Sequence, residues 1–299
     1  MKVAIISGYN GQDGKYLKKI LNEKGYKLKF IHEVLNEKLI RETIQSCSEY
    51  DVIEIYNLAA QSHVNISTVS TFEVNTMGIL NILEAVRALK FEKKCKIFQA
   101  SSSEIFGSVN EIPQDENTPY NPTSLYGISK LSAHLLAKYY RDVYKMYVCS
   151  GILYNHESPL RKDTFVTQKI IKGLKTGTCI TMGNIFSRRD WGHAEDYVEA
   201  MWLILQQSNP SDYVVATGVA HSVRDFIEIT ANKLGKKIIW SGKGENGIGS
   251  IDGKESIKVS SEFYRPTDVN TLVGNPSKLE SIGWKRKYDI HDIIEDMLK

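Results

Sequence analysis

GYNGQDG, at residues 8–14, stands between a short apolar run and a helical pattern. Lys2–Ser7 (KVAIIS) is rich in β-branched residues and predicts a strand, whereas Gly14–Lys24 repeats apolar residues at helical spacing. Three glycines between a strand and a helix let the backbone approach a pyrophosphate at the helix N-terminus. We therefore predict a dinucleotide-binding loop, with an ordinary glycine-rich turn as the alternative.

The first half of the chain continues this alternation of strand and helix patterns. Strands are expected at Lys27–His32, Val52–Asn57, Cys95–Ala100 and Met146–Leu153. Helices are expected at Leu39–Ser46, Val74–Leu89 and Ser124–Tyr144. Alternation of this kind builds a parallel sheet with helices on both faces. The predicted fold class is α/β, with a Rossmann-type doubly wound parallel sheet and a smaller C-terminal α/β substrate-binding lobe.

The pattern becomes irregular after about residue 154, which predicts a second unit. Helices are expected at Thr164–Lys175, Ala194–Leu205, Val223–Leu234 and Asp289–Leu298, a strand at Tyr213–Ala216 and a loop at Gly242–Gly253. We expect residues 1–154 to form the nucleotide-binding domain and residues 155–299 to form mainly the substrate-binding lobe. Some segments of that lobe are expected to return to the first domain, over the carboxyl edge of its sheet.

Composition narrows the class of protein. The chain has 299 residues and a net charge of +3, which is too balanced for a protein that binds nucleic acid mainly by neutralising phosphates. Its apolar runs are shorter than the ~20 residues of a membrane span, and its N-terminus does not read as a secretory signal. Four scattered cysteines, without CxxC spacing, favour free thiols. We expect a cytoplasmic protein.

The end of the second expected strand bears on the type of dinucleotide. An acidic residue about 20 positions past the glycine loop binds the ribose 2′-hydroxyl of NAD, whereas an arginine suits the 2′-phosphate of NADP. Glu33 stands at about this distance, and the first arginine of the chain is Arg41. This spacing favours NAD, although Glu33 is equally well explained as a solvated loop residue.

Tyr126 and Lys130 stand four residues apart at the start of the long expected helix 124–144. This spacing places the phenol and the ammonium on one helix face. The usual pKa of a tyrosine, about 10, is too high for a base at neutral pH, and a neighbouring cation can lower it. The pair is common on helix surfaces, so it indicates catalysis only together with the glycine loop.

Ser102 and Glu104 follow the expected strand 95–100, which places them at the carboxyl edge of the sheet. A serine hydroxyl there can donate to a substrate hydroxyl, and a carboxyl group can act as a general acid or base. The same S-x-x-E pattern is also a good helix cap, and both interpretations can hold together.

With these motifs in place, the sequence resembles the GDP-mannose 4,6-dehydratases of the extended short-chain dehydrogenase/reductase superfamily. The resemblance rests on GYNGQDG (8–14), NLAAQSHV (57–64), SSSEIFG (101–107), Tyr126 with Lys130, NHESP (155–159), RDWGH (189–193) and YRP (264–266). The glycine and Tyr–Lys motifs indicate only the superfamily, whereas the last three segments are much more specific. The resemblance covers nearly the whole chain.

The resemblance implies a lyase that converts GDP-mannose to GDP-4-keto-6-deoxymannose. Such enzymes oxidise C4 of the sugar, eliminate water across C5–C6 and return the hydride to C6, so the cofactor is regenerated. Tyr126 is implied to take the C4-hydroxyl proton and Lys130 to lower its pKa. Glu104 is implied to remove the C5 proton and, with Ser102, to help the C6 hydroxyl leave. The family usually has threonine where this chain has Ser102.

The resemblance also implies two sets of binding residues. The cofactor, NADP by resemblance and NAD by the presence of Glu33, is expected to contact Gly8, Asn10, Gly11, Gln12, Asp13, Gly14, Leu58, Ala59, Ala60, Tyr126, Lys130, His156 and Arg161. The GDP-sugar is expected to contact Ser62, Ser103, Glu104, Asn155, Val166, Lys169, Arg189, Arg265 and Asp268. Arginine suits phosphate because its planar guanidinium makes paired hydrogen bonds.

The chain departs from the family in length. The paired arginines, the long arm and the next strand that usually follow the second strand are absent from the sequence. Since that arm helps the family to form tetramers, we expect a homodimer built on the helices near Val74–Leu89 and Ser124–Tyr144, with a tetramer less favoured.

Several alternatives remain open at this point. The chain could act on another GDP-sugar such as a GDP-heptose, or it could be a GDP-4-keto-6-deoxy-sugar reductase or an epimerase. A module that senses nucleotides without turnover is disfavoured by the intact set of Ser102, Glu104, Tyr126 and Lys130. We expect no metal, because His63, His156 and His193 lack ligand spacing and the mechanism requires none.

Overall fold

The computed structural model describes residues 2–62, 69–108, 111–264 and 269–299. Strand β1 (Lys2–Ser7) lies between two layers of the fold, because its side chains are buried on both faces. Ala4 and Ile6 pack into one apolar cluster, and Val3 and Ile5 pack into another on the opposite face. A continuous apolar run of this kind is typical of a central parallel strand covered on both sides.

The main sheet has six strands in the order β2-β1-β3-β4-β5-β9, and every neighbouring pair is parallel. Its other strands are β2 (Tyr26–Ile31), β3 (Ile53–Asn57), β4 (Cys95–Ser102), β5 (Tyr147–Leu153) and β9 (Tyr213–Val215). The chain moves from β1 outward to β2 and then crosses to β3 on the other side of β1. This reversal marks the point where open α/β sheets bind ligands, beyond the carboxyl ends of the strands.

Helices cover both faces of this sheet. Residues of α1 (Gln12–Glu23) and α7 (Ala194–Leu205) bury one face, and residues of α2 (Glu37–Gln45), α4 (Gly78–Ala88) and α5 (Leu125–Tyr144) bury the other. The Rossmann-type doubly wound fold predicted from the sequence is therefore confirmed. Since β9 and α7 come from the second half of the chain, segments beyond residue 154 do return to this unit.

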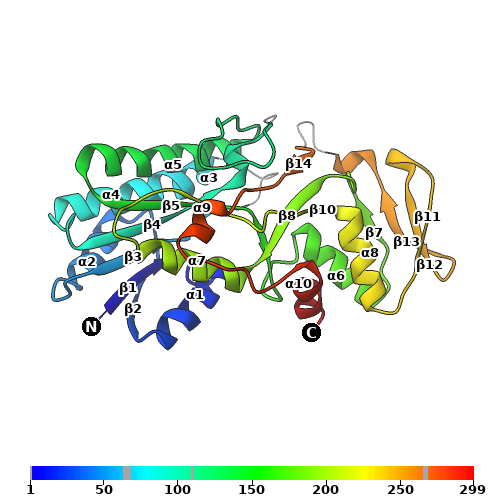
Figure 1. Cartoon of the computed structure of the whole chain (residues 1–299), viewed down its shortest axis with the longest axis horizontal. Coiled ribbons are helices and arrows are strands. Elements are labelled where there is room, and N and C mark those ends of the chain that lie inside the picture. Colours follow the sequence, from blue (N-terminus) through cyan, green and yellow to red (C-terminus); the bar gives the residue numbers. More distant parts are fainter. Residues whose placement is uncertain (1, 63–68, 109–110, 265–268) are drawn as a thin grey trace.

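A smaller unit lies beside the first along the long axis of the molecule (Figure 1). Its apolar core joins helices to a four-stranded sheet ordered β11-β12-β13-β7. The strands are β7 (Ile180–Met182), β11 (Ile238–Ser241), β12 (Ile248–Ile251) and β13 (Lys254–Val259), and the helices are α6 (Val166–Thr176), α8 (Val223–Lys233) and α10 (Ile290–Leu298). Strands β6 (Asn155–Glu157), β8 (Arg188–His193), β10 (Ala220–Ser222) and β14 (Thr271–Leu272) form another small sheet, and α9 is Ser277–Ser281.

Two predicted elements differ from the structure. The expected loop Gly242–Gly253 contains strand β12, because β11 and β13 supply hydrogen-bonding partners on both sides of it. The expected helix Val74–Leu89 begins inside a π-helical turn (Glu73–Met77), which joins a short helix, α3 (Val69–Phe72), to α4. In that turn Asn75 accepts from the backbone of Gln61 at 2.9 Å and donates to Ser129 at 3.0 Å, so a side chain competes with the regular helix pattern.

Strand β2 is the edge of the main sheet among the described residues. The chain continues from it into α2 and then directly to β3 on the far side of β1. This path agrees with the sequence, which lacks the strand that usually follows. Lys27 and Lys29 lie along the edge strand, where charged side chains discourage pairing with another chain.

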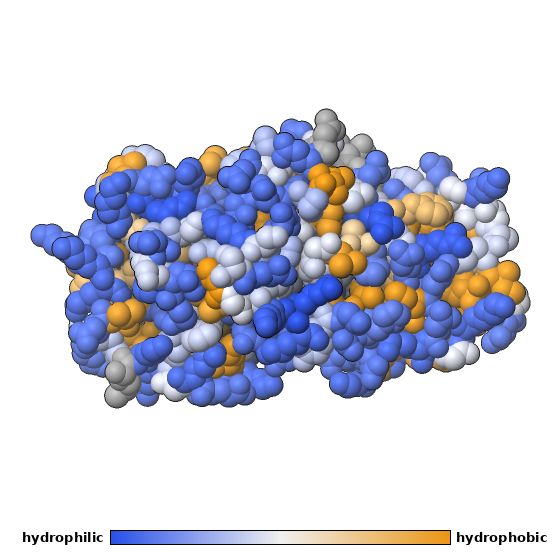
Figure 2. All heavy atoms as spheres, viewed as in Figure 1, coloured by the Kyte–Doolittle hydropathy of each residue, from blue (hydrophilic) through white to orange (hydrophobic). Residues whose placement is uncertain are grey.

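The surface and the cysteines are as the composition predicts. Figure 2 shows a largely hydrophilic face with apolar residues in separate patches. None of the helices in the described part of the chain is long and apolar enough to cross a membrane. All four cysteines are free, and only Cys179 is exposed.

Gly14 provides a test of the close packing behind the glycine loop. A side chain there would place Cβ 2.4 Å from Cα of Tyr9 and 2.5 Å from the Gly8 oxygen, and backbone atoms cannot move aside cheaply. Gly14→Ala should therefore lower the free energy of unfolding by about 1–3 kcal/mol, measured by urea denaturation. Gly11→Ala is the matched control, since its nearest atom lies at 3.3 Å. Equal losses in the two variants would contradict this account.

Candidate active site

A cavity of about 350 Å³ opens at the carboxyl edge of the main sheet, where the second unit meets it. It brings together residues that are far apart in the sequence. Predicted residues that line it are Gly8, Gly11, Gln12, Asp13, Gly14, Leu58, Ala60, Ser62, Ser102, Ser103, Glu104, Tyr126, Lys130, Asn155, His156 and Arg161. The glycine loop, the Tyr–Lys pair and the Ser–Glu pair therefore share one cavity.

The glycine loop is shaped for a close approach. Gly8 has φ +68°, and a Cβ there would lie 2.7 Å from the backbone nitrogen of Ala59. Helix α1 begins directly after Gly11, and no described side chain caps its N-terminus. Its first N–H groups and the positive end of its dipole thus point toward the cavity, which is the arrangement that binds a phosphate group.

Helix α5 carries the Tyr–Lys pair into the cavity. Ser124 caps the helix by accepting from the backbone of Gly127 at 2.9 Å, so Tyr126 lies in the first turn. Both Tyr126 and Lys130 are buried. The Lys130 ammonium donates to the Ala100 oxygen at 2.9 Å and lies 6.0 Å from the centre of the Tyr126 ring.

The surroundings of Tyr126 in this structure raise its pKa, so the lowering by Lys130 stays a prediction for the site with its cofactor bound. Burial raises the pKa of Tyr126 to about 12, and a hydrogen bond with Ser102 opposes this only in part. Burial also lowers the pKa of Lys130 to about 8. Removal from water disfavours the charged form of each group.

Ser102 and Glu104 lie where β4 ends. The Ser102 hydroxyl accepts from the backbone of Glu104 at 3.2 Å and so caps the short 3₁₀ turn Ser103–Ile105. A serine of the cavity wall therefore does cap this turn, but it is Ser102 and not Ser101, the first residue of the S-x-x-E pattern. The turn packs closely on α5: a Cβ atom added at Gly127 would lie 2.7 Å from the backbone oxygen of Glu104.

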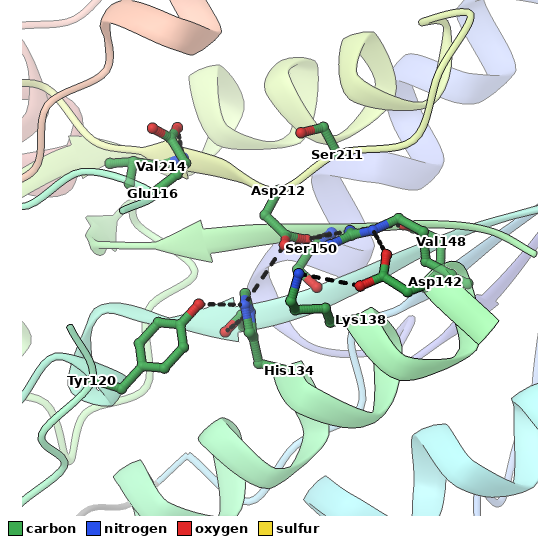
Figure 3. Close-up of polar contacts among 12 residues, drawn as sticks. Glu116, Tyr120, His134, Lys138, Asp142, Val148, Ser150, Ser211, Asp212 and Val214 are labelled. Carbon is green, nitrogen blue, oxygen red and sulfur yellow. Dashed lines mark hydrogen bonds and ion pairs between the residues drawn. The ribbon is translucent and has the colours of Figure 1, made fainter. Parts of the chain in front are cut away.

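A buried polar network behind the cavity fixes helix α5 (Figure 3). His134, one turn after Lys130, lies 3.2 Å from the Ser101 hydroxyl through Nδ1 and 3.0 Å from the Tyr120 hydroxyl through Nε2. Asp212 lies 3.7 Å from the same Nε2 and receives two hydrogen bonds of 2.7 Å from Arg141. Since Ser101 precedes Ser102, the network links the helix of Tyr126 to the strand of Ser102.

The charges of this network follow from burial and pairing. Burial lowers the pKa of His134, which keeps the imidazole neutral. Burial alone would raise the pKa of Asp212, but hydrogen bonds from Arg141 hold it below its usual value. A neutral histidine and a carboxylate–guanidinium pair can stay buried because their polar atoms are hydrogen-bonded.

Some predicted residues do not reach the cavity. Asn10, Ala59, Val166, Lys169 and Arg189 belong to the described part of the chain but are not among those that line it. Arg189 instead donates to the backbone oxygens of Arg188 and Val269 at 2.9 and 2.7 Å. Arg265, Asp268 and His63 lie outside the described residues.

The cavity also includes residues that the sequence analysis missed. These are Ala100, Ser101, Leu153, Tyr154, Leu160, Lys162 and Phe165. Ala100 and Leu153 belong to the ends of β4 and β5, so their position after a predicted strand was the available signal. Lys162 and Phe165 follow the NHESP segment and were too far from any strand for a pattern to indicate them. Within the described ranges, no group of three metal-ligating side chains is present.

Comparison with known proteins places this geometry in a family. The sequence profile described as GDP-mannose 4,6 dehydratase matches residues 30–297. The chain belongs to this family. It is 40% identical to the Caenorhabditis elegans protein GDP-mannose 4,6 dehydratase 2, over 99% of this chain and 88% of that protein. It is also 40% identical to the human GDP-mannose 4,6 dehydratase, over 99% of this chain and 90% of that protein.

The family resemblance seen in the motifs is therefore confirmed, and so is the shorter length. The alignment with the Caenorhabditis elegans family member spans 339 positions, more than the 299 residues of this chain. That relative thus has segments with no counterpart here.

Solved structures show the same fold at lower identity. The dTDP-glucose 4,6-dehydratase of Bacillus anthracis, in complex with NAD, aligns with a TM-score of 0.84 and 19% identity, covering 100% of this chain and 96% of that one. RMD from Pseudomonas aeruginosa, complexed with NADPH, gives 0.82 and 22%, covering 100% and 98%. At these identities the likeness concerns the fold alone.

Lys130 provides a test of the electrostatics. Its pKa falls from 10.5 to about 8 on burial, which corresponds to roughly 3 kcal/mol of destabilisation while the amine is charged. Lys130→Met should therefore raise the free energy of unfolding at pH 7 by about 2 kcal/mol, after loss of one hydrogen bond. The gain should shrink as the pH rises above about 8, because the lysine then loses its charge in the folded state.

The matched control is Lys138→Met on the same helix, where the ammonium is half exposed and pairs with Asp142. Urea denaturation of the control should show little change at either pH. A Lys130→Met protein that is less stable than the unaltered chain at pH 7 would overturn this reading of the burial.

Proposed function

We propose that this chain is a GDP-mannose 4,6-dehydratase, which converts GDP-mannose to GDP-4-keto-6-deoxymannose. The observation that carries the proposal is that Ser102, Glu104, Tyr126 and Lys130 line one cavity with the glycine loop. Relatives that bear this name are about 40% identical over almost the whole chain. We further propose that residues 1–154 hold the cofactor and that residues 155–299 mainly hold the sugar nucleotide.

The described residues suit a nicotinamide dinucleotide. The loop at Gly8 leaves no room for a side chain, and the uncapped N-terminus of α1 faces the cavity. When bound, such a cofactor accepts a hydride and later returns it. Lys130 would hold the ribose next to the nicotinamide, and Gly11 and Gly14 would border the pyrophosphate.

The type of dinucleotide is the finer part of the proposal. Family resemblance implies NADP. In contrast, Glu33 is exposed two residues after β2 ends, where a carboxylate favours the 2′-hydroxyl of NAD and repels a 2′-phosphate. Arg41, the first arginine of the chain, pairs with Glu37 at 2.5 Å. Mass spectrometry of the nucleotide released from the purified protein distinguishes the two.

The family resemblance implies a role for each of the four side chains, and the chemistry of each suits its role. Tyr126 takes the proton of the C4 hydroxyl as the hydride leaves C4, and Lys130 stabilises the phenolate that this requires. The resulting C4 ketone makes the C5 proton acidic, and Glu104 removes it. Ser102, with the proton now held by Glu104, assists departure of the C6 hydroxyl as water. The proton that Tyr126 took from the C4 hydroxyl is then the one available to protonate C5, which returns each side chain to its starting state.

Glu104 separates dehydration from the alternatives of reduction and epimerisation. Glu104→Gln removes the acid/base but keeps the size and the backbone cap, so nucleotide binding should persist. Formation of the 4-keto product from GDP-mannose should fall by about 10²–10⁴-fold, measured by mass spectrometry of the GDP-sugars. If this variant formed the 4-keto product as fast as the unaltered protein does, the role of Glu104 would be contradicted. No 4-keto product from the unaltered protein would contradict the proposed activity, and a GDP-heptose would then be tested as substrate.

We also propose a homodimer built on α5 and its neighbours. Along one stripe of α5, Leu125, Leu135 and Tyr139 are 52%, 46% and 51% exposed. Val69 and Met77, on the segment that packs beside α5, are exposed as well. A row of large apolar side chains on neighbouring helices is typical of a surface that a second chain covers.

The dimer can be tested by light scattering coupled to size exclusion. The unaltered protein should have the mass of two chains, and Leu135→Glu combined with Tyr139→Glu should have the mass of one, because buried charges destabilise an apolar interface. Ile239→Glu is the control, since Ile239 is 65% exposed on β11 in the other unit. A tetrameric mass, or a double variant that stays dimeric, would contradict the proposal.

A further inference from the structure

Asp13 and His156 form an ion pair between the two units, at the wall of the cavity. Asp13 is the second residue of α1, directly after the glycine loop, and His156 lies on β6 in the segment that enters the second unit. The His156 Nε2 atom lies 3.0 Å from each carboxylate oxygen of Asp13. Both side chains line the cavity with Tyr126 and Lys130.

The hydrogen bonds of the imidazole define its protonation. His156 Nδ1 lies 2.7 Å from the backbone oxygen of Tyr154, and a carbonyl oxygen can only accept. His156 Nε2 faces a carboxylate, which also accepts when it is ionised. Each ring nitrogen therefore carries a proton in this arrangement, so His156 is an imidazolium beside the Asp13 carboxylate.

The neighbouring residue Gln12 joins the same two segments. Its side-chain amide donates to the backbone oxygen of His156 at 3.0 Å and accepts from the Ser158 hydroxyl at 2.8 Å. The first turn of α1 thus holds residues 156–158 through both of its polar side chains. This contact fixes the second unit against the phosphate-binding end of the first.

β8, the strand that pairs with β6, carries Asp190 and His193. Further charged and titratable groups lie on the other elements near His156. They are Asp13 on α1, Glu157 beside it on β6, Arg161 in the loop that follows, Tyr154 after β5, Tyr197 on α7 with its ring stacked at 4.5 Å, and Tyr126, Lys130 and Glu104 across the cavity. Arg161 is itself held at 3.1 Å by Glu157. Asp13 is the carboxylate that meets the imidazole directly.

The position of Asp13 poses an electrostatic problem for an anionic ligand. The N-terminus of α1 attracts a pyrophosphate, but a carboxylate in the first turn repels one. With His156 protonated the Asp13–His156 pair carries no net charge, and the helix dipole remains attractive. With His156 neutral the pair carries a full negative charge at the entrance of the phosphate site.

We propose that binding of an anionic dinucleotide is linked to protonation of His156 because the imidazolium neutralises Asp13 at the phosphate-binding end of α1. Asp13 and His156 are thus positioning residues. Their ion pair joins the two units and also sets the charge at the phosphate-binding end of α1. This inference rests on the proposed use of a nicotinamide dinucleotide.

The pKa directions agree with the geometry. Burial alone would lower the pKa of His156, but the charge of Asp13 and its hydrogen bond raise it above 6.5. Burial alone would raise the pKa of Asp13, but His156 lowers it. Since the folded pKa of His156 is raised, the favourable contribution of the imidazolium is complete below the usual histidine value and is lost as the pH rises through the raised one.

The test follows the His156 ring by NMR of histidine-labelled, nucleotide-free protein. The chain has seven histidines, and loss of one signal in His156→Gln assigns the ring. Its titration midpoint should lie above about 6.5 and should move to higher pH when NAD⁺ or, in a separate sample, NADP⁺ is bound. By reciprocity, each unit of that shift corresponds to a tenfold change in dinucleotide affinity. An unchanged midpoint would overturn the proposal.

The coupling to Asp13 is tested by a set of variants. Asp13→Asn should lower the midpoint of His156. Asp296→Asn is the matched control, because Asp296 lies 3.1 Å from another buried histidine, His193, outside the cavity lining. It should leave the His156 midpoint unchanged. A midpoint that is the same in Asp13→Asn and in the unaltered protein would contradict the role of Asp13.

A double-variant cycle separates charge from a purely structural role and does not depend on Asp13→Asn alone. His156→Gln leaves Asp13 uncompensated, so the dissociation constant for NAD⁺ at pH 7, measured by calorimetry, should rise about tenfold or more. Adding Asp13→Asn should recover most of that loss. A further loss instead of a recovery would overturn the electrostatic account. Binding of neither dinucleotide by the unaltered protein would contradict the proposed function itself.

Discussion

A ladder of buried polar side chains across three strand ends holds the two halves of the site in register. The Ser7 hydroxyl donates to Asn57 at 2.6 Å, and the Asn57 amide donates to Gln99 at 2.7 Å. These residues are direct neighbours on β1, β3 and β4, and each is almost fully buried. Gln99 then donates to the Ala100 oxygen, which also accepts from Lys130. The glycine loop after Ser7 is thereby tied to the lysine of α5 by four side chains.

Burial and direct contacts together determine the pKa values of the charged residues in the site. Removal from water raises the pKa of Tyr126 and lowers the pKa of Lys130, so it disfavours the charged form of both groups. The opposite holds for Asp13 and His156, where direct hydrogen bonds to a partner outweigh burial. The two pairs thus differ because only Asp13 and His156 are in direct contact, whereas the Lys130 ammonium lies 6.0 Å from the centre of the Tyr126 ring.

The short path after β2 lies at one edge of the main sheet, away from the strand that ends at Ser102. β2 is the edge strand of the described sheet, and α2 leads straight back to β3. Strand β4, which ends at Ser102, lies beyond β1 and β3 in the sheet, and α5, which carries Tyr126 and Lys130, packs on β4 and β5. Two strands, β1 and β3, therefore separate the short path beyond β2 from the strand that ends at Ser102.

The sequence alone determined the layered α/β fold, since apolar runs and helical spacing report burial directly, and its motifs indicated most residues that line the cavity. It misjudged β12, because a glycine-rich segment becomes a strand only when β11 and β13 flank it. It could not indicate that Arg189 bonds to backbone oxygens or that His134 and Asp212 brace α5. Tertiary structure alone decided the charges, because a pKa depends on burial and on contacts such as Asp13 with His156, which stand 143 positions apart.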